Sequence, residues 1–312
     1  MPESQRKILV IKLAALGDFV QALGAFSAIA RHHQDDHLTL LTTDPYVELA
    51  RATGLFDQVL CDSKPRGLQL GQWLALRRTL RSGDYVRVYD LQTSDRSSFY
   101  RRLFWPSPSP QWSGIARGCS HPHDNPKRDF MHTTERQAEQ LQMAGVETEA
   151  DDMIGLSGLD SPVERFAVPE KFALLAVGGA AHRPEKRWPV ENYAKLAKRL
   201  LARGLTPVLL GGPAETEAMD HIVVDCPQAL NLCGLTSLPE IAGLARLASL
   251  SVGNDSGPMH LIAGLGCPSV VLYSHASDPG LCGQRGPKVS YIRKPDLADV
   301  GVDEVMEALE LA

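Results

Sequence analysis

The residues best suited to chemistry stand near the carboxyl end of the chain, where an apolar run ends. Residues 250–253 are followed by Asn-Asp-Ser-Gly-Pro at residues 254–258. Residue types that cap helices, followed by a proline, predict a helix that begins here, because proline fits the first helical turn but not a helix interior. Amides at a helix N-terminus, together with the helix dipole, favour a phosphate group, whereas Asp255 suits a ribose or an amine. This stretch therefore predicts a nucleotide site.

The chain around this stretch predicts a strand, a tight turn, a helix and a second strand. The predicted helix, residues 259–265, ends at Gly266, and residues 268–273 form a second buried strand. In parallel α/β sheets, ligands bind at the carboxyl ends of the strands, where this loop would lie. The nucleotide-binding residues expected from this unit are Asp255, Ser256, Gly257, Pro258, Met259 and His260. His260 could donate to a phosphate or serve only in packing.

A second loop follows a predicted strand of the same half. Residues 178–186, Gly-Gly-Ala-Ala-His-Arg-Pro-Glu-Lys, separate that strand from a helix that begins near Trp188. Gly178 and Gly179 let the backbone approach a ligand closely, and Lys186 could neutralise a pyrophosphate or be an ordinary surface charge. The pattern lacks the G-x-x-x-x-G-K-[ST] spacing of an ATPase loop.

Glu215 stands in a third loop, after Gly211 and Gly212 and at the start of another predicted helix. Glu215, or alternatively Glu217, could accept hydrogen bonds from the hydroxyls of a ribose. Glutamates in a first helical turn also complement the helix dipole, so both roles stay open for these residues.

A fourth loop, near the N-terminus, carries Gly17 and Asp18. It follows an apolar strand, residues 7–13, of the kind found at the centre of parallel sheets. Asp18 could simply cap the helix that follows, since aspartate before an apolar-periodic run is a common N-cap. Its place at a strand end also suits a catalytic carboxylate, and the dipeptide alone does not decide between the two roles.

Three of these stretches resemble the motifs of a known family, the bacterial ADP-heptose:lipopolysaccharide heptosyltransferases of glycosyltransferase family 9. The first is the apolar run Ile8–Leu13 leading to L-G-D at residues 16–18, and the second is K-R-W-P at residues 186–189. The third is N-D-S-G-P-M-H at residues 254–260, with the following G-x-P-x-V-x-L-Y and D-P. All three lie in the family's order and spacing, and the resemblance covers nearly the whole chain.

The resemblance implies a role for several residues. Asp18 takes the position of the family's proposed general base, and Lys186 that of a residue that contacts the donor phosphates. Lys12, in the first motif, and Arg96, in a stretch where family members carry a basic residue, are assigned to the acceptor. A free aspartate, with a pKa of about 3.9, is a poor base for a sugar hydroxyl. It can serve if the proton leaves late, once bonding to the anomeric carbon has made the hydroxyl acidic.

The pattern of strands and helices predicts an α/β protein with two similar halves. Predicted strands and helices alternate from residue 7 to residue 104 and again from residue 172 onward, which is typical of parallel sheets with helices on both faces. The segment 105–128, rich in Pro, Ser, Gly and His, predicts a loop or a short strand. The resemblance implies the GT-B fold, in which two Rossmann-like domains face each other across a cleft.

The domains expected are residues 1–160, which bind the acceptor, and residues 161–312, which bind the nucleotide sugar. A length of 312 residues suits two domains of roughly 150 residues each. Residues 145–169, with an acidic cluster and Pro162, are expected to link them. The last helix, residues 303–311, either stays with the second domain or crosses back to the first, as in many proteins of this two-domain type.

Composition and charge limit the protein class, the cellular location and the kinds of partner that the sequence favours. With 44% hydrophobic and 22% charged residues the chain is typical of a soluble globular protein, and its N-terminus predicts neither a signal peptide nor a transmembrane span, which favours the cytoplasm. The net charge is −5, but residues 61–130 carry 12 Lys and Arg against 6 Asp and Glu. This basic segment is either a solvated surface or a surface for an anionic acceptor, such as a phosphorylated glycolipid at the inner membrane. No nucleic acid partner is expected.

Neither a metal nor another cofactor is expected. The chain has no D-x-D at a strand end, its histidines lack the spacing of a metal site, and its six cysteines include no C-x-x-C pair. A departing nucleotide diphosphate would then be stabilised by Lys186 and by the helix amides at Gly257.

The function expected is inverting transfer of a heptose, or a related sugar, from an ADP-activated donor to a lipopolysaccharide-core or similar glycolipid acceptor. The alternatives are another GT-B enzyme, such as a nucleotide-sugar epimerase, and a non-catalytic nucleotide-sugar-binding protein, which would tolerate loss of Asp18. A dinucleotide oxidoreductase is disfavoured because no G-x-G-x-x-G follows a strand.

Overall fold

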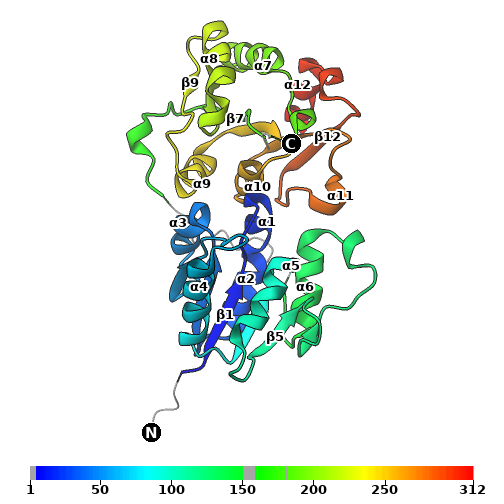
Figure 1. The fold of residues 1–312 in the computed structure, drawn as a ribbon. Helices are drawn as coiled ribbons and strands as arrows, with labels where there is room; N and C mark the ends of the chain where they lie inside the picture. The colour runs from blue at the N-terminus through cyan, green and yellow to red at the C-terminus, as the bar shows by residue number, and fades with distance from the viewer. Residues whose placement is uncertain (1–4, 150–158, 160, 180–181, 312) are drawn as a thin grey trace. The chain divides into compact units, whose positions relative to one another are not determined.

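The chain divides into two compact units, residues 1–158 and residues 159–312 (Figure 1). The computed structural model describes residues 5–149, 159, 161–179 and 182–311. Each unit is built on a six-stranded sheet in which neighbouring strands run parallel. The middle of the expected linker, residues 150–158, lies outside the described residues.

The first sheet has the strand order β3-β2-β1-β4-β5-β6, so β1 lies between β2 and β4. Its strands are β1 (Lys7–Ile11), β2 (His37–Thr42), β3 (Gln58–Cys61), β4 (Arg87–Asp90), β5 (Gln111–Gly114) and β6 (His121–Pro122). The helices of this unit are α1 (Leu16–Gln21), α2 (Leu23–His32), α3 (Asp44–Ala52), α4 (Leu70–Ser82), α5 (Asp95–Tyr100) and α6 (Thr133–Met143), with 3-10 turns η1 (Arg101–Phe104) and η2 (Arg128–Phe130).

The central strand β1 is buried on both faces of the sheet because successive side chains of a strand point to opposite sides. Leu9 and Ile11 join a core with α4 and η1, whereas Ile8 and Val10 point to the opposite face. Helix α6 packs beside α1 and α2. Burial on both faces explains why the sequence of β1 is apolar almost throughout.

The second sheet has the order β12-β11-β10-β7-β8-β9, with β10 and β7 paired at its centre. Its strands are β7 (Phe172–Ala176), β8 (Thr206–Leu210), β9 (Leu230–Asn231), β10 (Leu250–Asn254), β11 (Ser269–Tyr273) and β12 (Val289–Arg293). The helices are α7 (Val190–Ala202), α8 (Thr216–Asp225), α9 (Leu238–Leu247), α10 (Gly257–Gly264), α11 (Pro279–Cys282) and α12 (Val302–Leu311), with 3-10 turns η4 (Glu164–Phe166), η5 (Pro184–Lys186), η6 (Pro213–Glu215) and η7 (Leu297–Asp299).

A core shared by α7, α8 and α12 covers one face of the second sheet. Trp188, just before α7, is buried in it, and its indole Nε1 donates to the carbonyl of Val300 at 3.0 Å. Val305 and Met306 of α12 belong to the same core. Helix α12, whose position the sequence left open, therefore packs against α7 and β11 within its own unit. Helices α9 and α10 pack together, and α10 lies against β10 and β11.

The observed elements differ from the predicted ones where the elements are short. The single helix expected after β1 is two helices, α1 and α2, joined at Ala22. The segment 105–128, expected to be a loop or a short strand, contains the two short strands β5 and β6, and Trp112 of β5 is fully buried. Strands β9 and β12 and helix α11 were not predicted.

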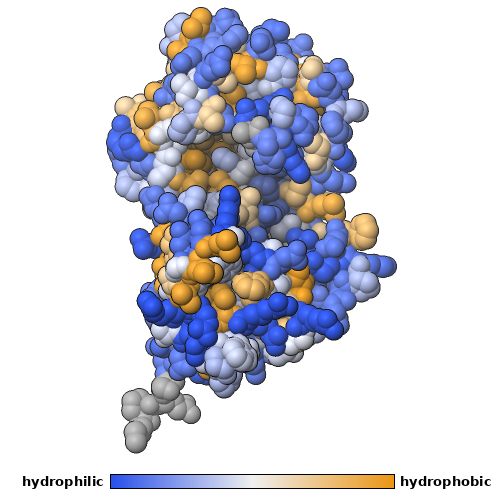
Figure 2. All heavy atoms as spheres, in the orientation of Figure 1, coloured by the Kyte–Doolittle hydropathy of each residue, from blue (hydrophilic) through white to orange (hydrophobic). Residues whose placement is uncertain are grey.

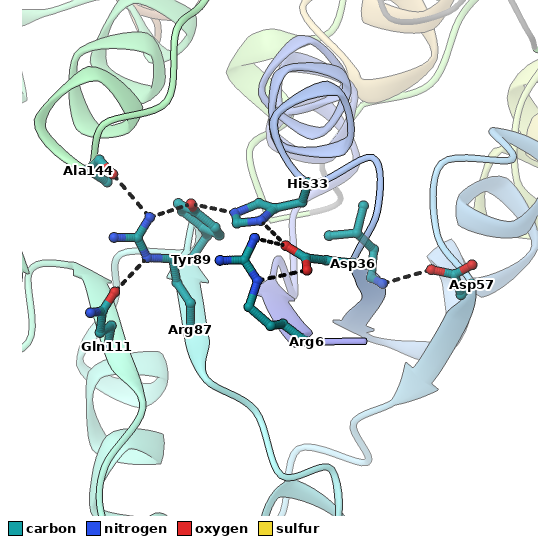
Figure 3. Close-up of polar contacts among 9 residues, drawn as sticks. Arg6, His33, Asp36, Asp57, Arg87, Tyr89, Gln111 and Ala144 are labelled. Atoms are coloured by element: carbon teal, nitrogen blue, oxygen red, sulfur yellow. Dashed lines mark hydrogen bonds and ion pairs between the residues drawn. The ribbon is translucent and has the colours of Figure 1, made fainter. Parts of the chain in front are cut away.

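A polar network joins the amino ends of β1 and β4 (Figure 3). Asp36 accepts two hydrogen bonds from Arg6, both at 2.9 Å, and its Oδ2 lies 2.7 Å from Nδ1 of His33. Nε2 of His33 lies 2.9 Å from the hydroxyl of Tyr89, which also accepts from Arg87. Burial lowers the pKa of His33, so a neutral ring connects the end of α2 to β4.

Both sheets reverse their winding at the centre. In the first sheet the chain runs outward from β1 to β3 and then restarts with β4 on the other side of β1, and in the second sheet β7 and β10 have the same relation. In open α/β sheets ligands bind at such switch points, outside the carboxyl ends of the two neighbouring strands. The segments that leave these ends include residues 12–15 and 91–94 in the first unit, and residues 177–179, 182–189 and 255–256 in the second.

Candidate functional site

Asn254, at the end of β10, connects the loops at the second switch point. Its Oδ1 accepts from the backbone N–H of Trp188 at 2.9 Å. Its Nδ2 donates to the carbonyls of Val177 at 2.8 Å and Gly178 at 3.3 Å. This side chain therefore fixes two points relative to β10. One is the start of the glycine loop, by which we mean residues 178–186, and the other is Trp188, which follows that loop.

Lys186 and Asp255 form an ion pair at this edge of the sheet. Nζ of Lys186 lies 2.6 Å from Oδ2 of Asp255, and the two side chains are 12% and 6% exposed. The sequence suggested that Asp255 suits a ribose or an amine, and within the protein it contacts the amine of Lys186. The fold thus brings together two side chains, 69 residues apart, that the sequence assigned to one ligand.

Asp255 is also held at its other carboxylate oxygen. Nε2 of Gln284 donates to Oδ1 of Asp255 at 3.3 Å, and the hydroxyl of Tyr273 donates to Oε1 of Gln284 at 2.7 Å. Nε2 of His260 lies 4.0 Å from the same Oδ1. Burial acts to raise the pKa of Asp255, but the hydrogen bond and charge of Lys186 and the charge of His260 outweigh it, so this pKa is lowered. The carboxylate is therefore ionised and held in one orientation.

Glu215 lies against the glycine loop, whereas Glu217 is exposed. One carboxylate oxygen of Glu215 accepts from Nη2 of Arg187 at 3.1 Å, and the other accepts from a backbone N–H of its own loop at 2.9 Å. The same Nη2 donates to the carbonyl of Gly179 at 2.7 Å. A Cβ atom at Gly178 would lie 3.2 Å from Cδ of Glu215, so glycine at this position allows the close approach.

The N-terminus of α10 presents backbone amides rather than large side chains. Ser256 is the N-cap residue, and Pro258 stands in the first turn. The side chain of Met259 is buried against Gly253, where a Cβ atom would lie 2.6 Å from Sδ of Met259. Met259 could therefore meet a ligand only through its backbone N–H.

Two of the polar atoms at this edge are buried without a hydrogen-bond partner among the residues that the structure describes. Oγ of Ser256 and Nε of Arg187 are both buried, and neither has a hydrogen-bond partner among the described residues. Buried polar atoms are usually paired, so the two atoms are suited to a ligand that approaches between α10 and the glycine loop.

At the first switch point, Asp18 lies in the first turn of α1. Its Oδ2 accepts from the backbone N–H of Ala15 at 3.2 Å, so Asp18 caps the helix from its third position, whereas the N-cap residue, the place that the sequence allowed for Asp18, is Ala15. Oε1 of Gln92 accepts from the N–H groups of Leu13 and Ala14 at 2.7 and 3.0 Å. The loop after β4 thus fixes the loop that leads into α1 and Asp18. A capping hydrogen bond and a catalytic role are compatible, because Asp18 is partly exposed.

Lys12 is buried beneath this loop. Its Nζ donates to the carbonyl of Leu91 at 3.1 Å. Burial lowers the pKa of Lys12, while the charges of Asp18 and Asp90 act in the opposite direction. Burial also raises the pKa of Asp90 to about 6. The amino group of Lys12 therefore supports the loop after β4, and the assignment of Lys12 to the acceptor stays a prediction.

Arg96, in α5, contacts neighbours within the first unit. Its Nη1 donates to the carbonyl of Pro65 at 3.1 Å and to the hydroxyl of Tyr100 at 3.4 Å. Its guanidinium carbon lies 5.7 Å from the centre of the Trp73 ring, at the range of a cation–π contact. Arg96 thus holds the loop after β3 against α4 and α5, and its contact with an acceptor stays a prediction.

In the part of the chain that the structure describes, no three His, Cys, Asp or Glu side chains are grouped so that they could hold a metal ion. None of the helices described there is long and apolar enough to cross a membrane.

Comparison with protein families identifies the chain. The model of glycosyltransferase family 9 (heptosyltransferase) matches residues 73–299. The chain belongs to this family. The family assignment drawn from the three motifs is thereby confirmed, and the matched segment of this family 9 chain includes Arg96, Lys186 and Asp255, whereas Asp18 precedes it.

Curated relatives of the family 9 chain are heptosyltransferases by name. Lipopolysaccharide heptosyltransferase 2 of Escherichia coli is 40% identical over 104 residues, which are 32% of this chain and 30% of that protein. Lipooligosaccharide heptosyltransferase 2 of Haemophilus ducreyi is 25% identical over 295 residues, which are 87% of this chain and 84% of that protein. The match to the Escherichia coli relative is thus confined to about a third of either protein.

The structure of Escherichia coli ADP-heptose lps heptosyltransferase II covers 98% of this chain and 98% of its own, with a TM-score of 0.79 and 23% sequence identity. At this identity the similarity shows the fold alone. The predicted α/β fold of the GT-B class, with two parallel sheets, is confirmed.

Three polar residues near these sites received no role from the sequence. Arg187 stands inside the K-R-W-P motif, so its position beside Lys186 was the available signal. Gln284 lies 29 residues after Asp255 in a loop without a recognised motif, and only the fold brings the two together. Arg136 of α6 is the third: burial lowers its pKa, and the charge of Asp18 acts against that shift.

Proposed function

We propose that this family 9 chain transfers a heptose, or a related sugar, from an ADP-activated donor to a lipopolysaccharide-core or similar glycolipid acceptor, with inversion at the anomeric carbon. Residues 161–312 bind the nucleotide sugar and residues 1–160 bind the acceptor. The names of the relatives support the donor and acceptor classes. The reaction takes place in the cytoplasm, at the inner membrane surface where a glycolipid acceptor is presented.

The donor phosphates bind between Lys186 and the N-terminus of α10. The first amides of α10, those of Gly257 and Met259, favour an anion together with the helix dipole. The unpartnered atoms of Ser256 and Arg187 support the same position, because each could donate to a phosphate oxygen. As the diphosphate leaves, Lys186 and these amides neutralise its charge, and the mechanism requires no metal ion.

The hydroxyl groups of the donor bind to the two carboxylates of the site. Glu215 lies under Gly178 with both oxygens in fixed positions, which suits a ribose whose two hydroxyls donate side by side. Asp255 is kept ionised by Lys186 and oriented by Gln284, so it accepts hydrogen bonds without first losing a proton. His260, beside Asp255, is placed to donate to the same part of the donor.

Asp18 is the general base of a single displacement. The acceptor hydroxyl oxygen forms a bond to the anomeric carbon, the bond from that carbon to the ADP oxygen breaks, and the hydroxyl proton passes to the Asp18 carboxylate. One displacement at the anomeric carbon inverts its configuration. Because an aspartate is a weak base, the proton moves late, after bonding has made the hydroxyl acidic. Lys12 and Arg96 assist from the acceptor side.

The convergence of Lys186, Asp255 and the N-terminus of α10 at the second switch point carries this proposal. A mass-spectrometric screen of nucleotide sugars against lipopolysaccharide-core acceptors tests it. The expected result is an acceptor enlarged by one heptose, with one ADP released per transfer and an inverted anomeric configuration in the product. Conversion of the nucleotide sugar without any change in the acceptor would instead indicate an epimerase. Binding of the nucleotide sugar without turnover would indicate a binding protein.

A further inference from the structure

The first unit exposes a group of large apolar side chains at the start of α4. Leu68, in the preceding loop, is 92% exposed, and Leu70 and Leu74 are 65% and 58% exposed. Figure 2 shows hydrophobic atoms gathered over α4, with hydrophilic atoms beside them. Exposed leucines are ordinary when scattered, but a contiguous group needs a physical reason.

The leucines of α4 continue into a row of arginines along the same side of the helix. Positions 70, 74, 78 and 81 are Leu, Leu, Arg and Arg. At about 100° per residue these four positions fall within about 80° of the helix circumference. The buried residues of α4, Leu76 and Leu80, lie on a different side. The helix therefore has a second ordered face, and the core does not use it.

Residues of α5 and η1 extend this face. The ring of Phe99, which is exposed, lies 5.4 Å from that of Trp73 in α4. Trp105, also exposed, follows η1, and its carbonyl accepts from Nη2 of Arg77 at 2.7 Å. The α4 patch, as we define it, comprises the exposed apolar residues Leu68, Leu70, Leu74, Phe99 and Trp105.

The arginines around the α4 patch are not paired with carboxylates of the described residues. They are Arg66, Arg77, Arg78, Arg81, Arg101 and Arg102. Their described hydrogen bonds go to neutral oxygens, from Arg77 to a carbonyl, from Arg81 to the hydroxyl of Ser107, and from Arg101 to two carbonyls. Within the described ranges none of the six forms an ion pair with a carboxylate. This contrasts with Arg165 and Arg203 of the second unit, which are paired with glutamates.

From this arrangement we infer that the α4 patch docks the protein on the surface of an anionic lipid bilayer. Leucine and phenylalanine side chains enter the boundary between headgroups and acyl chains, while tryptophan stays at headgroup level and the arginines meet lipid phosphates. A protein partner would need a mixed polar surface that matches this pattern in detail. A bilayer needs only apolar residues beside unpaired cations, and the α4 patch supplies both.

Docking is tested with the full chain and vesicles that contain no glycolipid acceptor, so the result does not depend on the proposed transfer. We expect the protein to sediment with anionic vesicles of phosphatidylcholine and phosphatidylglycerol and to bind more weakly to neutral vesicles of pure phosphatidylcholine. This preference for anionic vesicles should be lost at high salt. The paired substitutions Leu70→Ser and Leu74→Ser should lower the vesicle partition coefficient about tenfold or more. Leu247→Ser is the matched control, because Leu247 in the second unit has the same 58% exposure as Leu74.

The arginine contribution is tested with Arg78→Gln combined with Arg81→Gln. Binding to the anionic vesicles should fall about fivefold per arginine, and binding to neutral vesicles should not change. Equal loss in the Leu247→Ser control, or equal binding to neutral and anionic vesicles, would overturn the inference. The inference would also be overturned if the two leucine substitutions reduced self-association of the protein in the ultracentrifuge but left its binding to vesicles unchanged. The same holds if the protein bound only to vesicles that carry the glycolipid acceptor. Circular dichroism would confirm that the variants are folded, as expected for exposed positions.

Discussion

The ion pair between Lys186 and Asp255 gives the most specific prediction. Its N···O distance is 2.6 Å, and both side chains are nearly buried. At an effective dielectric constant of about 20, two unit charges at this separation attract with about 6 kcal/mol. Desolvation of the two charges offsets much of this attraction, but removing one partner leaves the other charge buried and unpaired, which costs about 3–5 kcal/mol.

A double-mutant cycle measures this coupling. Lys186→Met and Asp255→Asn should each lower the free energy of unfolding by about 3 kcal/mol, and the double variant should lose scarcely more than either one. The coupling energy expected is therefore about 2–4 kcal/mol, measured by urea unfolding that allows a separate transition for each unit. Calorimetry of the same variants should show ADP affinity about 10- to 100-fold lower, as expected when a charged hydrogen bond is lost.

The second unit contains a matched control. Arg165 and Glu240 also lie 2.6 Å apart, but the side chain of Arg165 is largely exposed. Solvent screens exposed pairs, so the cycle at Arg165 and Glu240 should give a clearly smaller coupling and no change in ADP affinity. If the two cycles gave equal coupling, burial would not be what makes the first pair strong. If ADP affinity were unchanged in both Lys186→Met and Asp255→Asn, the assignment of this pair to the donor would be wrong.

Three further predictions concern other residues. Gln284→Leu should lower the affinity for ADP about threefold to tenfold, because Asp255 loses a hydrogen bond that orients its carboxylate. Unchanged ADP affinity in calorimetry would show that Gln284 does not contribute to the site. Burial lowers the pKa of His33 in the folded protein, so as the pH falls the His33 ring takes up a proton in the unfolded chain at a higher pH than in the folded one. The free energy of unfolding should therefore decline below about pH 6.5. His33→Gln should flatten this decline in urea unfolding between about pH 7 and pH 5, and an unaltered slope would contradict the explanation. Arg96→Ala should raise the acceptor KM and weaken its dependence on salt, whereas Arg96→Lys should keep the salt dependence; identical behaviour of the two variants in initial-rate assays would argue against electrostatic capture.

Much of the fold could be predicted because apolar runs bounded by glycine or proline coincide with its elements. From residue 172 onward, the alternating apolar pattern predicts a helix over residues 190–202, a strand over residues 206–210 and a helix over residues 238–247, and these are the bounds of α7, β8 and α9. β5 was not predicted as a definite strand, because its four residues follow a proline-rich stretch and its single large apolar side chain, Trp112, gives no periodic pattern. Strand β12 is partly exposed, so its sequence lacks the continuous apolar run that marks β7 or β11.

The candidate site was predictable where its residues stand beside strand ends. Lys186, Glu215 and Asp255 follow β7, β8 and β10, and parallel pairing places those ends at one edge of the sheet. The internal pairing of Lys186 with Asp255 was not predictable, because it depends on side-chain contacts across 69 residues. Gln284 was missed for the same reason: its orientation is set by Tyr273, which the sequence marks only as part of a buried strand.

The most direct test of the central claim compares transfer and donor binding in Asp18→Asn. If Asp18 is the general base and the second unit alone holds the nucleotide, the rate of heptose transfer from ADP-heptose should fall by about 10²- to 10⁴-fold. The dissociation constant of ADP, measured by calorimetry on the same preparation, should stay at the wild-type value. A transfer rate near wild type would contradict the role of Asp18, and a loss of ADP affinity as large as the loss of rate would contradict the separation of base and donor site between the two units.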